Sequence, residues 1–371
     1  MLCSGLFLEI GKFIVEHHRK REALEMVLEK VESHEELAVQ GMTLRAARTD
    51  DIEAAVDLFN AAAESLIGVA DKFSVEDNQQ EWSTPGFNLE TDTRVVVAPD
   101  GSLVGYYEVW DIDDPHVSVS CWGYVHPDYT GMGIGTALLD WAERRARQAV
   151  SKAPPGTRVI MRAHALTIDQ KAQTLFQDCG FEFVRHGLRM VIDLDGLPPD
   201  AQWPDSIVVR TLRVGEDERA VVQAVRESFQ DHWGFVEHPF EDEYARWMHL
   251  MRENPDFDPL LWFLAMDGDE IAGVSLCWPK THDDAEMGWV GMLGVRRPWR
   301  RRGLALALLH HSFAEFYRRG LRRVGLGVDA QSLTGATRLY QKAGMRPDAQ
   351  RQFSLYEKEL RPGKDITTRS V

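Results

Sequence analysis

The sequence repeats itself, and the repeat restricts the chain to a fold that can be built twice. A glycine-bearing block near residue 130 recurs 170 positions later, and a second block near residue 172 recurs 164 positions later, in the same order. The six-residue difference falls in the stretch from Ser151 to Gly156, whose Pro and Gly content is typical of loops that tolerate insertions. The matched pairs are Thr130 with Arg300, Gly133 with Gly303, Gly135 with Ala305, Leu138-Leu139 with Leu308-Leu309, Ala172 with Ala336, Leu175 with Leu339, Phe176 with Tyr340 and Gly180 with Gly344.

The second copy of the first block, Val290 to Gly320, has the pattern of a strand, a turn and a helix. Its apolar run, Val290 to Val295, predicts a strand, and an arginine-rich turn containing Pro298 leads to a helix that opens at Gly303. A glycine at a helix start lets a ligand approach the backbone closely, and the unpaired amides of the first turn, together with the helix dipole, attract anions. The stretch therefore predicts a phosphate-binding site.

Two spacings sharpen this prediction to a family. Arg300, Gly303 and Ala305 follow the pattern R/Q-x-x-G-x-G/A, and the segment from Ala336 to Met345 follows A-x-x-L-Y-x-x-x-G-F/M. Together they resemble the acetyl-CoA site of the GNAT acyltransferase superfamily. The resemblance covers Met42 to Leu360 as two tandem copies. The tandem arrangement resembles that of the mycothiol synthase family, in which two GNAT copies are fused and the second is catalytic.

The order of elements in each copy fits a layered α/β fold, in which a mixed central β-sheet is flanked by helices. The linker between the copies is predicted from the Pro-, Asp- and Gly-containing run DLDGLPPDAQWP. The predicted segments are a helical N-terminal extension (1–41), a degenerate N-terminal GNAT-like domain (42–192), a linker (193–204), a catalytic C-terminal GNAT domain (205–362) and a polar tail (363–371).

The composition excludes several classes of function. With 42 Lys and Arg against 58 Asp and Glu, the chain has a net charge of -16 and no basic surplus for nucleic-acid phosphates. Its four cysteines form no C-x-x-C pair, so neither a metal site nor a disulfide framework is predicted. No apolar run is long enough for a membrane span, and the first residues do not fit a signal peptide. We therefore expect a cytoplasmic protein without a metal, nucleic-acid or membrane partner, and no oligomeric state is predicted.

The resemblance assigns acetyl-CoA, the acyl donor, to the second copy. The backbone amides of the turn would hold the pyrophosphate, with Arg300 and Arg302 adding charge. The strand residues before the turn would offer backbone groups to the pantetheine arm as though it were another strand. The residues predicted to bind acetyl-CoA are Leu293, Gly294, Val295, Arg300, Arg301, Arg302, Gly303, Leu304, Ala305, Leu306 and Ser332.

Acyl transfer from a thioester to an amine requires a base for the acceptor's proton and a proton donor for the leaving thiolate. The resemblance implies that Tyr340 is the donor, and a phenol of ordinary pKa, about 10, is protonated at neutral pH. Glu286, near the start of the strand that leads into the turn, is the predicted base, although Trp289 occupies the register nearer to the family's glutamate. The alternatives are a water relay or the loop residues Asp231, His232 and Glu237.

The first copy departs from the family's pattern where the chemistry should lie. Thr130 replaces the arginine or glutamine of the turn, and Phe176 replaces the tyrosine, so no proton donor occupies that place. The glycines Gly131, Gly133 and Gly135 are kept. We interpret this copy as degenerate, with a structural or acceptor-shaping role.

These observations predict an acetyl-CoA-dependent N-acetyltransferase that moves an acetyl group to the primary amine of a small molecule by direct attack, in its C-terminal copy. Two other functions fit the same motifs. One is a CoA-binding sensor or interaction module without turnover, and the other is an acetyltransferase of protein N-termini or lysines. A dinucleotide-binding oxidoreductase is excluded, because the glycine turn follows a late strand and lacks G-x-G-x-x-G.

Overall fold

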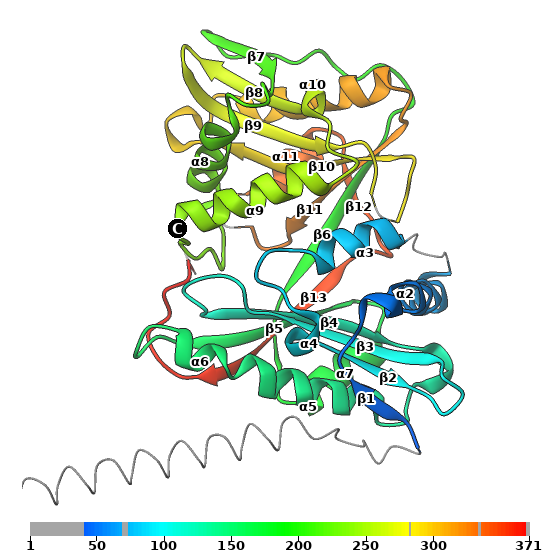
Figure 1. The fold of residues 1–371 in the computed structure, drawn as a ribbon. Helices are drawn as coiled ribbons and strands as arrows, with labels where there is room; N and C mark the ends of the chain where they lie inside the picture. Colours follow the sequence, from blue (N-terminus) through cyan, green and yellow to red (C-terminus); the bar gives the residue numbers. More distant parts are fainter. Residues whose placement is uncertain (1–40, 69–72, 282, 333–334, 369–371) are drawn as a thin grey trace, which may run out of the picture.

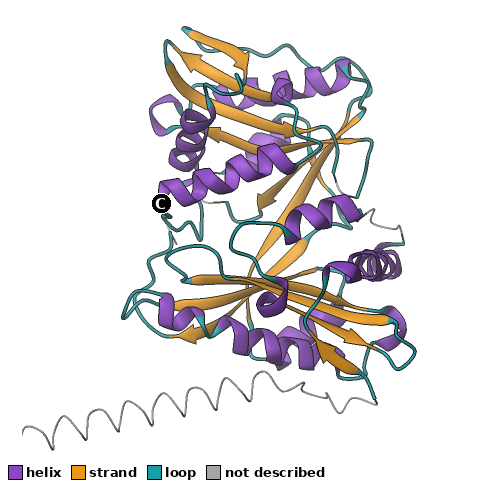
Figure 2. Cartoon of the chain, in the orientation of Figure 1, coloured by secondary structure: helices purple, strands orange, loops and turns teal. Residues whose placement is uncertain are grey.

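The structure is a computed structural model that describes residues 41–68, 73–281, 283–332 and 335–368. The helical extension predicted for 1–41 lies outside the described residues except for its last residue. Figures 1 and 2 show two α/β layers, one above the other, with long strands running between them. We call the layer that begins at β1 the first half and the layer that begins at β7 the second half.

Both halves contain the same succession of helices and strands. The first half comprises β1 (Thr43–Arg45), η1 (Thr49–Asp51), α2 (Ile52–Ile67), α3 (Val75–Trp82), α4 (Leu89–Asp92), β2 (Thr93–Val97), β3 (Leu103–Trp110), β4 (Ser118–Val125), η2 (Pro127–Tyr129), α5 (Ile134–Ala146), α6 (Ala149–Lys152), β5 (Val159–Leu166), α7 (Gln170–Asp178) and β6 (Glu182–Asp193). The second half comprises β7 (Ile207–Thr211), α8 (Glu218–Phe229), α9 (Phe240–Glu253), η3 (Pro259–Leu261), β8 (Trp262–Asp267), β9 (Glu270–Trp278), β10 (Met287–Val295), η4 (Arg297–Trp299), α10 (Leu304–Arg318), β11 (Arg323–Asp329), α11 (Ala336–Lys342), β12 (Arg346–Pro347) and β13 (Phe353–Arg361).

The strands of both halves form one continuous sheet. Its order is β1-β2-β3-β4-β5-β13-β6-β11-β10-β9-β8-β7, with β12 paired to β6 outside this path. The pairs β4–β5 and β10–β11 are parallel, and every other pair of named strands is antiparallel. The predicted mixed sheet flanked by helices is therefore confirmed, and each half has its parallel pair in the same place.

The last strand of the chain belongs to the sheet of the first half. β13 lies between β5 and β6, and its residue Tyr356 is 1% exposed in the hydrophobic core that also contains Val159 and Met161. In the other direction, β6 pairs over its C-terminal part with β11, and Met190 enters the core of the second half. Each half therefore completes its sheet with a strand that pairs with strands of the other half. These pairings join residues on both sides of the predicted linker, 193–204.

The two parallel pairs diverge after a short run. β4 and β5 pair only from Ser118 to Ser120, and β10 and β11 only from Met287 to Trp289. Beyond these points, the edge of β4 facing β5 and the edge of β10 facing β11 have no strand partner among the described residues. An unpaired strand edge presents N–H and C=O groups, so each half can accept an extended ligand as an additional strand.

The exchange of strands predicts that a substitution near the C-terminus will destabilise the first half. We expect Tyr356→Ala to lower the free energy of unfolding by about 3 kcal/mol, because it leaves a cavity in the first core. Hydrogen exchange should then increase in peptides of β5 and α7 before those of β8 and β9. Leu355→Ala, at a half-buried site on the same strand, is the control and should have a smaller effect. Loss of protection confined to the second half would contradict the exchange.

Candidate active site

The turn before α10 has the backbone geometry of an anion site. Gly303 is the N-cap of this 15-residue helix, with a φ of 85°, and no side chain caps the helix. Arg301 also has a positive φ, 60°, which a residue with a side chain adopts only at a cost. A Cβ added at Gly303 would meet nothing within 4 Å, so the space above the first-turn amides is open. Leu304, Ala305 and Leu306 supply amides of this turn, which suit a phosphate.

The arginines of the turn divide into two kinds. Arg300 is occupied by protein: its Nε donates to the Val295 carbonyl at 3.0 Å, and its Nη1 donates to Asp231 Oδ2 at 2.5 Å. Arg301 and Arg302 are exposed and form no ion pair with the described residues. Arg300 thus anchors the turn to the loop after α8, and of the two arginines predicted to add charge, Arg302 is unpaired among the described residues, as is Arg301.

Asp231, in the loop after α8, is the carboxylate to which Arg300 of the turn is bound. It is 4% exposed and accepts hydrogen bonds from Arg297 as well as Arg300. The Arg297 guanidinium, followed by that of Arg300, lowers its pKa to about 2. A carboxylate with so low a pKa is a weak base at neutral pH, so the geometry gives Asp231 a positioning role.

The strand residues predicted to accompany the pantetheine arm lie on the open edge of β10. Leu293, Gly294 and Val295 pair with β9 on one side and have no strand on the other among the described residues. A Cβ at Gly294 would lie 2.8 Å from Cβ of Ser228, so α8 packs directly against this strand. The helix thus fixes the position of the open edge.

A β-bulge distinguishes the second half from the first. The register between β10 and β9 shifts between Val290 and Met292, which leaves Gly291 without a partner. In the first half, β3 and β4 pair continuously from Gly105 to Trp110. Bulges reorient backbone groups and are frequent next to active sites.

Tyr340 lies on α11, beside the open edge of β11. The side chain is 7% exposed and packs in the core of the second half. Burial raises its pKa to about 12, and its hydroxyl forms no hydrogen bond with the described residues. The phenol is therefore protonated at neutral pH and free to donate. Ser332, in the preceding loop, accepts a hydrogen bond from the Ala336 amide at 3.4 Å and contributes to the start of α11.

Glu286 is exposed in the turn before β10, at the end of the strand opposite to the glycine turn. The Glu286 amide donates to Asp284 Oδ1 at 3.0 Å. Glu286 lines neither of the two cavities described below. The structure does not bring it together with Tyr340. His232, another alternative, lies against Phe229 with the two rings tilted at 50°, and burial followed by the charge of Arg300 lowers its pKa.

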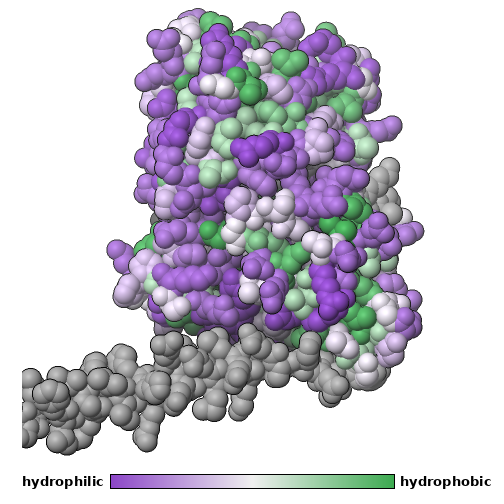
Figure 3. Space-filling model, in the orientation of Figure 1, coloured by the Kyte–Doolittle hydropathy of each residue, from purple (hydrophilic) through white to green (hydrophobic). Residues whose placement is uncertain are grey.

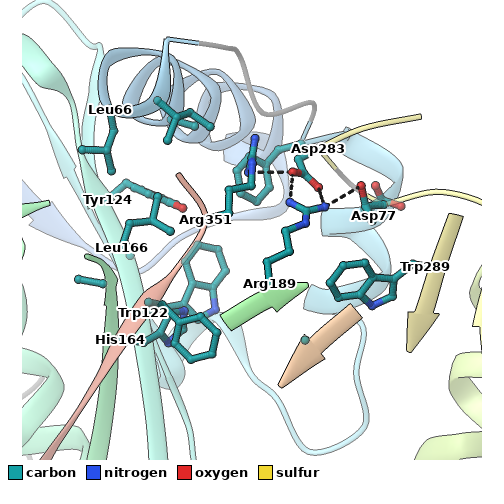
Figure 4. A pocket seen from close by; sticks show the side chains of 18 of the residues that line it. Leu66, Asp77, Trp122, Tyr124, His164, Leu166, Arg189, Asp283, Trp289 and Arg351 are labelled. Atoms are coloured by element: carbon teal, nitrogen blue, oxygen red, sulfur yellow. Dashed lines mark hydrogen bonds and ion pairs between the residues drawn. The ribbon is translucent and has the colours of Figure 1, made fainter. Parts of the chain in front are cut away.

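A cavity of about 790 Å³ lies between the halves. Figure 4 shows Arg189 of β6 and Arg351 pointing at Asp283, with Trp289 beside Arg189. Asp283 accepts from Arg189 at 2.5 and 3.0 Å and from Arg351 at 2.8 Å. The Arg189 guanidinium lies 5.1 Å from the Trp289 ring centre. Sequence reasoning missed this cluster, because it forms through the exchanged strand.

A second cavity, of about 610 Å³, adjoins the first, since both are lined by Asp77, Gln80 and Leu250. It lies between α3 of the first half and α9 of the second, and it reaches Met292 on β10. Figure 3 shows that the surface in this view is mostly hydrophilic, with apolar patches where the halves meet. The described residues contain no group of three or more His, Cys, Asp or Glu arranged to hold a metal ion.

The first half has a glycine turn like that before α10, but it has Phe176 where the second half has Tyr340. Gly131 and Gly133 have φ values of 80° and 84°, and a Cβ at either would meet nothing within 4 Å. Thr130 accepts a hydrogen bond from Lys171 at 3.2 Å. Phe176 is 6% exposed and packs against Tyr356 of the exchanged strand. This half therefore has the backbone of an anion site, with a phenyl ring, Phe176, at the position that corresponds to Tyr340.

The fold and the two turns define a tandem GNAT-like protein, and comparison with known proteins agrees. The model described as Acetyltransferase (GNAT) family matches residues 54–181 and again residues 222–345. The chain belongs to this family, and the predicted tandem arrangement is confirmed. It is an N-acetyltransferase, and the members of the family use acetyl-CoA.

Several known proteins match this chain over most of their own length. A GCN5-related N-acetyltransferase structure from Sphaerobacter thermophilus is 37% identical, covers 89% of this chain and 98% of its own, and superposes with a TM-score of 0.71. The mycothiol acetyltransferase of Streptomyces scabiei is 28% identical over 83% of this chain and 94% of its own length. That of Salinispora arenicola is 31% identical over 67% and 76%. In the described part of the chain, no helix has the length and apolarity needed to cross a membrane.

The anchor of the turn makes a pH-dependent contribution to stability. Because the pKa of Asp231 is lowered, its ion pairs stabilise the fold above about pH 4, and this stabilisation is lost as the pH falls towards 2. We expect Asp231→Asn to reduce the free energy of unfolding at pH 7 by only about 1 to 2 kcal/mol, because the Arg297 side chain is 60% exposed and solvent weakens its ion pair. The difference from the parent should shrink at pH 2. Asp269→Asn, in an exposed turn, is the control. An equal effect at both pH values would contradict the ion-pair account.

The open space above the turn gives a second prediction. Gly303→Ala and Gly320→Ala place a methyl group at the two ends of α10, at similar φ values, 85° and 90°, with no neighbour within 4 Å. Both should cost about 1 kcal/mol of stability from backbone strain. Calorimetry should show that only Gly303→Ala weakens coenzyme A binding, by about tenfold, because its methyl group enters the anion site. Equal affinities in the two variants would place the pyrophosphate elsewhere.

Proposed function

We propose that the second half transfers the acetyl group of acetyl-CoA to the primary amine of a small molecule. The observation that carries this proposal is the difference between the halves. The second half combines an open strand edge, a bulge at Gly291 and the unbonded, buried phenol of Tyr340. The first half has the open edge, no bulge and Phe176 in place of the phenol.

Each part of this arrangement has a task in direct transfer. The amides of the Gly303 turn bind the pyrophosphate, and the β10 edge aligns the pantetheine arm, which brings the thioester to the bulge. The amine nitrogen attacks the thioester carbonyl, so a C–N bond forms and the C–S bond breaks. The leaving thiolate takes the proton of Tyr340, and a base takes the proton of the amine.

The cavities between the halves support a small acceptor. Their volumes, about 790 and 610 Å³, are in the range of small-molecule sites, which are enclosed by protein on most sides. The relatives named mycothiol acetyltransferases also suggest a small-molecule acceptor. A protein N-terminus or lysine is disfavoured, because a polypeptide would have to pass between α3 and α9.

The proposal is tested by free-thiol release from acetyl-CoA with a panel of glucosamine, spermidine, kanamycin and a lysine-containing peptide. We expect release that depends on a small amine and falls at least about 100-fold in Tyr340→Phe, because the thiolate loses its proton donor. Gly133→Glu, which blocks the turn of the first half, is the matched control and should retain most activity.

Three results would contradict the proposal. Coenzyme A binding without release with any amine would favour a sensor, and release with the peptide alone would favour a protein acetyltransferase. If Gly133→Glu abolishes release and Tyr340→Phe does not, the chemistry lies in the first half.

A further inference from the structure

The smaller cavity connects the first half to the reaction centre of the second. On one side it is lined by Glu81 of α3, and on the other by Trp247 and Leu250 of α9. Figure 1 shows α3 at the junction of the two halves. The smaller cavity is also lined by Met292, the residue that follows the β10 bulge. The cavity is therefore an access route from outside to the point of β10 where the thioester would lie.

The bulge decides which face of the sheet this route reaches. Met292 packs with Trp247 and Trp278, on the face covered by α8 and α9. Leu293, the next residue, packs with the core on the α10 and α11 side, which contains Tyr340. An amine in the cavity thus approaches β10 from the face opposite to the proton donor, so it can add to the thioester carbonyl while Tyr340 stays on the side of the departing sulfur.

The charged groups around the cavity differ in whether they are paired. Asp113 pairs with Arg246 at 2.8 Å, and Glu243 pairs with Arg226 at 3.6 Å. Glu81 has no cation within ion-pair distance among the described residues. The titratable and charged groups that face it are Asp77 on α3, Tyr106 and Glu108 on β3, Asp113, and His238, Glu243, Arg246 and His249 in and before α9.

The surroundings of Glu81 suit proton transfer near neutral pH. Burial, followed by the charge of Asp77 one turn earlier on the helix, raises the pKa of Glu81 to about 7. A base is most effective when its pKa is close to the working pH, since it can then both accept and release a proton. Glu108 lies behind it, and burial followed by the charge of Glu81 raises its pKa well above the ordinary value. Both carboxylate oxygens of Glu108 accept hydrogen bonds, from the Tyr106 hydroxyl and the Trp110 indole, so Glu81 is the carboxylate left for the proton-accepting role.

We propose that Glu81, carried by the first half, is the general base for the acetyl transfer catalysed in the second half. This inference rests on the proposed function. When the amine nitrogen bonds to the carbonyl carbon, its proton passes to the Glu81 carboxylate, directly or through one water, and the thiolate released by C–S cleavage takes the proton of Tyr340. The first half is then a catalytic partner, although it has lost its own proton donor.

The test is the pH dependence of kcat with the best amine of the panel. In the parent, kcat should fall about tenfold per pH unit below about pH 7. Glu81→Gln should lower kcat at pH 8 by about 100-fold and remove this dependence, with the KM for acetyl-CoA unchanged. Glu76→Gln, exposed on the same helix, is the matched control and should behave as the parent.

Asp77→Asn is the second variant, and its effect has a definite sign. Removing this negative charge lowers the pKa of Glu81, so the loss of kcat should move to lower pH and activity at pH 6 should rise relative to that at pH 8. If α3 has only a structural role, the pH dependence of kcat in Asp77→Asn will match that of the parent. NMR titration of ¹³C-labelled glutamate gives the same pKa without turnover: it should be near 7 in the parent and lower in Asp77→Asn.

Several results would overturn the inference. One is a Glu81 carboxyl that titrates near 4.5. Another is a Glu81→Gln variant that keeps the parent's profile, or a profile that disappears in His232→Gln instead. In these cases, amine-dependent release that still requires Tyr340 leaves the proposed function intact. Failure of the parent to release thiol with any amine counts against the proposed function itself.

Discussion

The pairing of β13 with β5 and of β6 with β11 is the interaction on which the rest of the structure depends. β6 is a 12-residue strand whose first part lies beside β13 and whose second part lies beside β11. Neither half can complete its sheet from its own stretch of sequence. The ladders of backbone hydrogen bonds and the buried Tyr356 and Met190 therefore fix the halves relative to each other.

This fixed arrangement creates the spaces in which an acceptor can bind. α3 and α9 face each other across the smaller cavity, and the Arg189–Asp283–Arg351 cluster lines the larger one. The two halves thus have glycine turns of the same shape, at Gly133 and Gly303. The exchange of strands places α3 of the first half across the smaller cavity from β10 of the second. If the proposed function holds, the first half remains necessary without a phenol at the position of Phe176, because it lines one side of the cavity.

The glycine turn and the family were predictable from sequence, because they depend on short-range spacing. The positive φ of Gly303 and the helix that starts there follow from residues adjacent in the chain. The partner of Arg300 was not predictable, because Arg300 is bound to Asp231, 69 positions earlier in the chain. The predicted base Glu286 lies in an exposed turn, and no periodicity pointed to Glu81, which comes near β10 only through the exchange of strands. The proposed catalytic roles stay predictions.

The most direct test of this account is a crystal structure of the full chain with a bisubstrate analogue, coenzyme A joined through an acetyl bridge to spermidine. We predict the pyrophosphate on the Gly303 turn, the acetyl bridge beside the β10 bulge and the polyamine in the cavity between α3 and α9, within reach of Glu81. A pyrophosphate bound only at the Gly133 turn, or a polyamine that leaves on the α10 and α11 side of the sheet, would contradict it.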